Sequence, residues 1–270
     1  MSRISEQLRQ LESRLEQSQG AEKAGCLLDL AELLMELGIF SRAQDRLEKG
    51  LKLAAQEKQE GPTCRGYLLL ARLQAARGLG KPAEETLDRL RGLAKGKTLE
   101  PYEALAEAER IRWRCEQGDD LGAREGLSEL ARRWTPPAGS ELEFRMRILR
   151  ARLTDQAEEA LRALEQARQA EHPFRVLEAA RTAAEIYLKQ GDLRAAFEYA
   201  GQVREAVAQM AADLPPEYEE EFWADERKRF LLAGLSGPVG PIAQAVKTVK
   251  GGRNEEEFRR LQLLLDSYQK

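Results

Sequence analysis

Apolar residues recur along this chain at helical spacing, in stretches of about 15 residues that are separated by short turns. In the stretch before Gly38, the residues Leu27, Leu30, Ala31 and Leu34 share one face of a helix. A second amphipathic stretch begins just after this glycine. A helix often ends on a residue in the left-handed conformation, which glycine adopts at little cost. The pattern therefore predicts a helix, a tight turn and a second helix.

This predicted hairpin repeats five times. Gly38, Gly78 and Gly118 recur every 40 residues, and two further copies follow at shorter intervals around Asp155 and Gly191. The fourth copy has no glycine. Each turn is followed by a small residue, which would allow two helix backbones to approach closely, and these residues are Ala43, Ala83, Ala123, Ala160 and Ala196. We therefore expect an all-α protein with at least ten helices, no strand, and buried contacts at these alanines.

The repeat resembles the tetratricopeptide repeat (TPR). The residues that carry the resemblance best are Gly38, Ala43 and Leu47 in the first copy and Gly191, Ala195 and Ala196 in the fifth. It covers about residues 24–208, and its spacing of about 36–40 residues exceeds the usual value of about 34. Longer spacing is similar to the degenerate bacterial repeats of regulators and assembly factors. The resemblance implies an α-solenoid of about five TPR-like hairpins, over residues 21–213, with capping helices at both ends.

The N-terminal segment, residues 1–20, has a different pattern from the repeats. Ile4, Leu8, Leu11 and Leu15 follow one another in a 4-3-4 spacing, surrounded by charged residues. We interpret this amphipathic helix as a cap, because a terminal repeat must cover its apolar face. The alternative is a helix for weak self-association.

The C-terminal segment also differs. Residues 214–235 are predicted to form a capping helix, spanning about 217–232, in which aromatic residues such as Trp223 and Phe230 concentrate. Residues 236–270 are predicted as a Gly/Pro linker at 236–241, a short helix at 242–249 and a final helix capped by Asn254. Residues 214–231 are similar to the segment that closes the repeat region in bacterial multidomain regulators and kinases.

The amino-acid composition is typical of a helical protein, and the apolar runs bear on its expected location in the cell. Of 270 residues, 42% are hydrophobic and only 6% aromatic, and 43 basic residues nearly balance 46 acidic ones for a net charge of −3. The longest apolar runs, such as residues 67–71, are far shorter than the roughly 20 residues that cross a bilayer. No secretory signal is visible at the start of the chain. We expect a cytoplasmic protein without membrane insertion.

Residue types that perform chemistry are scarce. The cysteines Cys26, Cys64 and Cys115 lie far apart, which predicts buried apolar residues rather than disulfides or a zinc site. The only histidine, His172, precedes a proline and is expected to be a solvated loop residue. Glycine-rich phosphate loops and Ser/His/Asp constellations are missing. The sequence therefore predicts no catalytic residue, no metal and no cofactor.

The TPR resemblance also predicts a binding surface, because the first helix of each hairpin lines the concave side of a TPR superhelix. The corresponding positions carry mostly arginine, and the basic residues there are Arg65, Arg72, Arg112, Arg145, Arg152, Arg181 and Lys189. Acidic residues at these positions are Glu32, Glu36, Glu116 and Glu185. Because the guanidinium group suits carboxylates, we expect this face to bind an acidic segment. The alternative is that these are ordinary solvated helix residues.

These observations favour a non-enzymatic scaffold that binds a segment of another protein on its concave face. The alternative is a regulatory sensor module, responsive to a peptide or small ligand, of a bacterial transcription regulator or kinase system. Nucleic acid is not expected as a partner, because the net charge is negative and no helix is strongly basic.

Overall fold

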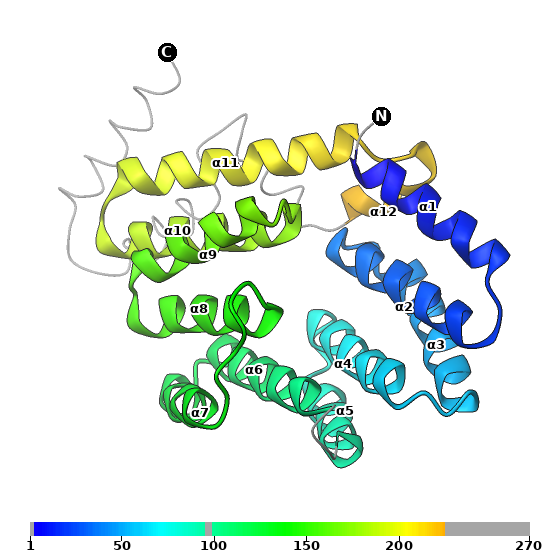
Figure 1. The fold of residues 1–270 in the computed structure, drawn as a ribbon. Coiled ribbons are helices and arrows are strands. Elements are labelled where there is room, and N and C mark those ends of the chain that lie inside the picture. The colour runs from blue at the N-terminus through cyan, green and yellow to red at the C-terminus, as the bar shows by residue number, and fades with distance from the viewer. Residues whose placement is uncertain (1–2, 95–98, 225–270) are drawn as a thin grey trace. The chain divides into compact units, whose positions relative to one another are not determined.

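The computed structural model describes residues 3–94 and 99–224, which form twelve α-helices and no strand (Figure 1). The predicted all-α fold of sequential hairpins is confirmed. The helices are α1 (Arg3–Gln17), α2 (Gly20–Glu36), α3 (Phe40–Gln56), α4 (Glu60–Ala76), α5 (Gly80–Leu93), α6 (Glu100–Glu116), α7 (Asp120–Arg133), α8 (Glu141–Thr154), α9 (Ala157–Gln169), α10 (Pro173–Gln190), α11 (Leu193–Ala212) and α12 (Pro216–Ala224).

The chain divides into two compact units, Met1–Pro215 and Pro216–Lys270. The second unit contains α12, where the rings of Phe222 and Trp223 meet edge to face. The rest of the predicted C-terminal structure lies outside the described residues, including the helix beyond residue 224, the linker at 236–241, the helix at 242–249 and the helix capped by Asn254. The first unit contains α1 to α11 and all of the predicted binding residues.

In the first unit, five hairpins follow one another as a solenoid. The pairs α2 and α3, α4 and α5, α6 and α7, α8 and α9, and α10 and α11 pack together, and each first helix contacts the first helix of the next hairpin. The additional helix α1 packs against α2 and buries Ile4 and Leu8. These five first helices, α2, α4, α6, α8 and α10, are called the inner helices below.

The turns of the hairpins have the predicted backbone conformation. Gly38, Gly78, Gly118 and Gly191 follow their helices with φ between +71° and +79°. The fourth hairpin, which lacks the glycine, uses Asp155 with φ of +51° at the same place. Aspartate is one of the few other residues that adopt this conformation at modest cost.

The alanine after each turn is buried, as the repeat predicts. Ala43, Ala83, Ala123, Ala160 and Ala196 are all at most 6% exposed. A larger side chain at these positions would have to displace the neighbouring helix, since protein interiors leave few voids.

We therefore expect Ala123→Leu to lower the free energy of unfolding by about 1–3 kcal/mol through overpacking. Urea unfolding followed by circular dichroism measures the effect. The control is Ala131→Leu in the same helix, because Ala131 is exposed and should tolerate leucine. If Ala123→Leu and the control unfold at the same urea concentration, the five alanines do not occupy equivalent buried helix contacts.

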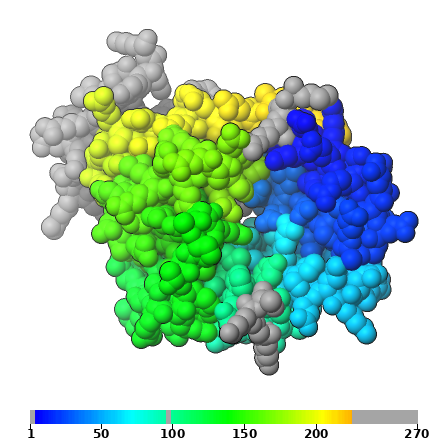
Figure 2. Space-filling view, in the orientation of Figure 1, coloured from blue at the N-terminus to red at the C-terminus, as the bar shows by residue number. Residues whose placement is uncertain are grey.

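The two ends of the first unit meet. The hydroxyl of Ser5 in α1 donates a hydrogen bond to the backbone carbonyl of Asp213, the residue that follows α11. In Figure 1 the helices follow one another around a circle until α11 returns to the side of α1. Figure 2 shows the yellow-green and blue parts of the chain meeting on one face. The solenoid of the first unit is therefore closed.

Candidate partner-binding site

Charged side chains of all five inner helices form one connected network inside the first unit. We call it the central cluster, and its members are Glu32, Arg65, Arg72, Glu109, Arg112, Glu141, Arg145 and Glu178. Arg65 pairs with Glu32 between α4 and α2, and Arg145 pairs with Glu178 between α8 and α10 at 2.8 Å. The cluster thus links each inner helix to another.

Arg72 on α4 is the centre of this cluster. It is 9% exposed, and its Nε donates to Oε1 of Glu109 at 2.7 Å while its Nη2 donates to Oε1 of Glu141 at 2.6 Å. Glu141 belongs to α8, so this contact reaches past α6. Such charge-assisted bonds are about twice as strong as neutral ones, and they hold three inner helices in register.

Two carboxyl groups of the cluster, those of Glu109 and Glu141, have strongly lowered pKa values. Burial alone would raise the pKa of Glu109, but the guanidinium groups of Arg112, Arg72 and Arg145 outweigh it and hold that pKa at about 2. Burial opposes ionisation of Glu141 as well, yet Arg72 and Arg145 hold its pKa at about 2. Both groups are therefore ionised at neutral pH.

The seven predicted binding residues divide into two sets. Arg65, Arg72, Arg112 and Arg145 belong to the central cluster, where acidic residues already occupy their guanidinium groups. The other three are Arg152 near the end of α8, Arg181 at the middle of α10 and Lys189 near the end of α10, and we call them the C-terminal basic group. The structure thus brings the first four together in one network of ion pairs, and in the part of the chain that it describes the last three form no ion pair with that network.

The C-terminal basic group has fewer acidic partners than the arginines of the central cluster. Nη2 of Arg152 donates to the hydroxyl of Thr182 at 3.3 Å, while its Nε is buried without a hydrogen-bond partner. Arg181 is 47% exposed, and within the described part of the chain its one ion pair is with Glu185, one turn along the same helix. Lys189 is 62% exposed and reaches Asp155 at 3.0 Å.

Sequence reasoning found the arginines of the inner helices but missed most of their acidic partners. Glu109, Glu141 and Glu178 were not among the expected groove residues, and Arg72 is buried rather than solvated. The spacing of these residues in the sequence could have indicated the pairs, because the ion pairs between adjacent inner helices join residues 33 to 37 positions apart. This interval is about one repeat.

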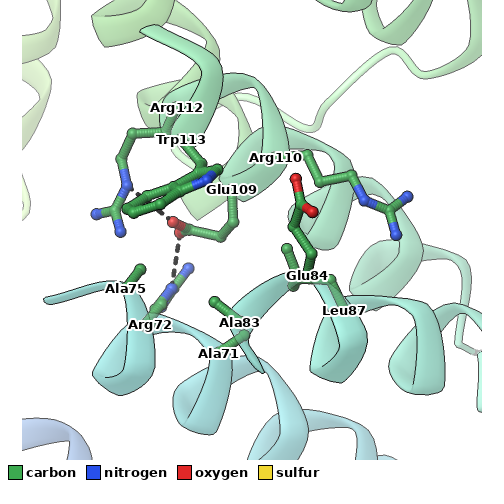
Figure 3. A pocket seen from close by; sticks show the side chains of 10 residues that line it. All are labelled: Ala71, Arg72, Ala75, Ala83, Glu84, Leu87, Glu109, Arg110, Arg112 and Trp113. Atoms are coloured by element: carbon green, nitrogen blue, oxygen red, sulfur yellow. Dashed lines mark hydrogen bonds and ion pairs between the residues drawn. The ribbon is translucent and has the colours of Figure 1, made fainter. Parts of the chain in front are cut away.

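A small pocket adjoins the cluster between α4, α5 and α6 (Figure 3). The indole of Trp113 lies against Gly80, where a Cβ atom would come within 2.2 Å of the ring, so this contact requires glycine. The apolar walls are formed by Ala71, Ala75, Ala83 and Leu87. The pocket holds about one water-sized group, which is too little for a ligand of drug size.

His172 differs from the expectation of a solvated loop residue. It is the N-cap residue of α10, and its ring is partly buried, with Nδ1 enclosed and without a hydrogen-bond partner. Burial, together with the charge of Arg175, lowers the pKa of His172 below its usual value. Its Nε2 lies 4.0 Å from Oε1 of Glu36, at the end of α2.

The cysteines and the acidic residues give no sign of chemistry. Cys26 and Cys64 are buried, as expected, and Cys115 is partly buried. Burial raises the pKa of the Cys64 and Cys115 thiols, which favours the less reactive protonated form. Within residues 3–94 and 99–224, no group of three or more His, Cys, Asp or Glu side chains could hold a metal ion.

Comparison with known proteins gives no match: no family model, no curated protein and no solved structure matches this sequence. The TPR resemblance therefore stays a prediction from the repeat. Among the described helices, none combines the length and the apolar character needed to span a bilayer.

Proposed function

We propose that this chain is a non-enzymatic scaffold of the TPR type, acting in the cytoplasm, which binds an acidic segment of a partner protein through the C-terminal basic group. The observation that carries the proposal is the state of Arg152. Among the described residues it is the one predicted arginine without a carboxylate at ion-pairing distance, although its charge contributes to the lowered pKa of Glu178. A carboxylate of a partner would complete the pairing of this guanidinium group.

The other two residues of the C-terminal basic group support the same ligand chemistry. Lys189 and Arg181 on α10 are largely exposed, so their charges can reach a partner without first breaking a buried contact. The central cluster is a poorer binding surface, because an acidic ligand there would have to displace Glu109 or Glu141 from Arg72. Breaking a buried ion pair is costly.

The alternative function, a ligand-responsive sensor module of a bacterial regulator or kinase system, has one observation in its favour. The ends of the solenoid touch through Ser5 and Asp213, so the first unit has a contact whose loss would change its shape. A sensor requires two such states that a ligand can distinguish.

The scaffold proposal predicts that the double variant Arg181→Glu/Lys189→Glu binds an acidic peptide about tenfold more weakly than the unaltered chain. Opposite charges attract a ligand at short range, and the variant reverses two of them. Fluorescence anisotropy with a labelled glutamate-rich peptide measures the dissociation constant. Circular dichroism should show unchanged helices, because exposed substitutions usually alter stability by under about 0.5 kcal/mol.

The matched control is Arg124→Glu/Arg132→Glu on α7, which makes the same change in net charge at two exposed positions of an outer helix. It should leave the dissociation constant nearly unchanged. Equal weakening by both double variants would mean that only net charge matters, and the proposed surface would be wrong.

A further inference from the structure

Two exposed leucines lie close to the turns of the second and third hairpins. Leu79 directly precedes α5 and is 48% exposed, and Leu121 is the second residue of α7 and is 72% exposed. Within the described residues, Leu93 at the end of α5 is the one other exposed large hydrophobic side chain. A single exposed leucine is ordinary in a folded protein, so the position of these two leucines matters more than their exposure alone.

Both leucines belong to one surface of the first unit, which we call the turn rim. It consists of the turns within the five hairpins, the last turn of each inner helix and the first turn of each outer helix. Because the repeats of a solenoid stack in the same orientation, the turns of neighbouring hairpins lie on the same side. The hairpin turns are residues 37–39, 77–79, 117–119, 155–156 and 191–192.

Contacts between neighbouring hairpins make the turn rim continuous from the second hairpin to the fifth. The indole of Trp113 on α6 lies against Gly80, the residue that follows Leu79. The third and fourth hairpins meet where α6 packs against α8. At the next step Nζ of Lys189 donates to Oδ1 of Asp155 at 3.0 Å, which joins the ends of α10 and α8. One extended ligand can therefore contact all four of these hairpins.

The two halves of this surface differ in chemistry. At the second and third hairpins the two leucines accompany the partly buried Trp113, and the exposed carboxylates of Asp119 and Asp120 lie beside them in the sequence. These carboxylates repel an acidic ligand. At the fourth and fifth hairpins the rim carries Arg152 and Lys189, which attract one. A ligand that reaches both halves thus needs apolar side chains for the first half and carboxylates for the second.

We propose that the turn rim binds a partner segment that joins a pair of large apolar side chains to a run of acidic residues. The apolar side chains cover Leu79 and Leu121, while the carboxylates pair with Arg152 and Lys189. This inference rests on the acidic segment proposed above and adds an apolar part to it. Covering both leucines removes apolar area from water and should strengthen binding about tenfold.

Fluorescence anisotropy with the full chain and labelled peptides tests this composition. The reference is the glutamate-rich peptide. The other peptides carry the same acidic run and a pair of leucines before or after it, on glycine–serine linkers of different length. The best of these leucine peptides should bind about tenfold more tightly than the reference.

The double variant Leu79→Ser/Leu121→Ser should remove this gain, so that all peptides bind as the reference does. Serine is a favoured N-cap residue, and position 79 is the N-cap of α5, so the helices should be retained. The matched control is Leu93→Ser at the opposite end of α5, where the leucine is 47% exposed, and it should keep the full gain. Arg181→Glu/Lys189→Glu should weaken the binding of every peptide.

The possible results separate this inference from the scaffold proposal. If the leucine peptides bind no more tightly than the reference, the apolar part is wrong and the scaffold proposal stands. If the gain depends on the two leucines but Arg181→Glu/Lys189→Glu binds every peptide as tightly as the unaltered chain, the proposed basic group fails and the leucines remain the binding surface.

Two further results would overturn the role of the leucines. A gain that survives in Leu79→Ser/Leu121→Ser would place the apolar side chains of the ligand elsewhere. A dimer of the unaltered chain that becomes a monomer in this variant, measured by light scattering, would assign the leucines to a contact between two copies.

Discussion

Arg72→Met is expected to lower the free energy of unfolding by about 3–5 kcal/mol. Methionine keeps most of the length of the side chain but removes the charge at the centre of the cluster. Glu109, which is 5% exposed, would then lose its shortest ion pair while remaining enclosed, and the partly buried Glu141 would lose its shortest ion pair as well. Urea unfolding at pH 7, followed by circular dichroism, measures the loss by linear extrapolation.

Two comparisons make this result specific to the cluster. Arg132→Met on α7 removes an exposed arginine and should change stability by less than about 0.5 kcal/mol. In a Glu109→Gln background, Arg72→Met should cost less than it does alone, because one of the stranded charges is already absent. A cost below about 1 kcal/mol for Arg72→Met alone would show that the cluster does not hold the inner helices together.

Lowering the pH from about 4.5 to about 2 is expected to remove a comparable amount of stability. The folded-state pKa values of Glu109 and Glu141 are about 2, below the ordinary value of 4.5, so the stabilisation is present above pH 4.5 and is lost as pH falls through 2. A shift of this size corresponds to about 3 kcal/mol for each group. The two effects are less than additive because both carboxyl groups bond to Arg72.

Urea unfolding at several pH values between 5 and 2 tests this expectation. Glu109→Gln should be less stable at pH 7 and should show a shallower loss of stability at acid pH. An unchanged slope in this variant would assign the acid sensitivity to other carboxyl groups.

The local features of the hairpins could be predicted from the sequence because each depends on a few neighbouring residues. A left-handed turn requires glycine or a small polar residue, which explains both Gly38 and Asp155. A close helix contact requires a small side chain, so the periodic alanines indicated buried positions.

The contacts inside the solenoid of the first unit could be predicted only in part. Helical spacing indicated which face Arg72 occupies, but its bond to Glu141 joins residues 69 positions apart. That contact depends on how tightly successive hairpins curve, and no single hairpin contains this information. The contact between Glu36 and His172 depends on the sum of the four rotations that relate the first hairpin to the fifth, so it could not be foreseen from any one of them.

Contact between the two ends also fixes the number of hairpins in the first unit. An open solenoid can gain or lose a hairpin during evolution, because every interior unit contacts only the units before and after it. Here an added hairpin would carry α11 past α1 and separate Asp213 from Ser5, while a lost one would leave a gap between them. A chain that forms this ring cannot change its number of hairpins one at a time, and relatives with four or six hairpins would need a different way to end.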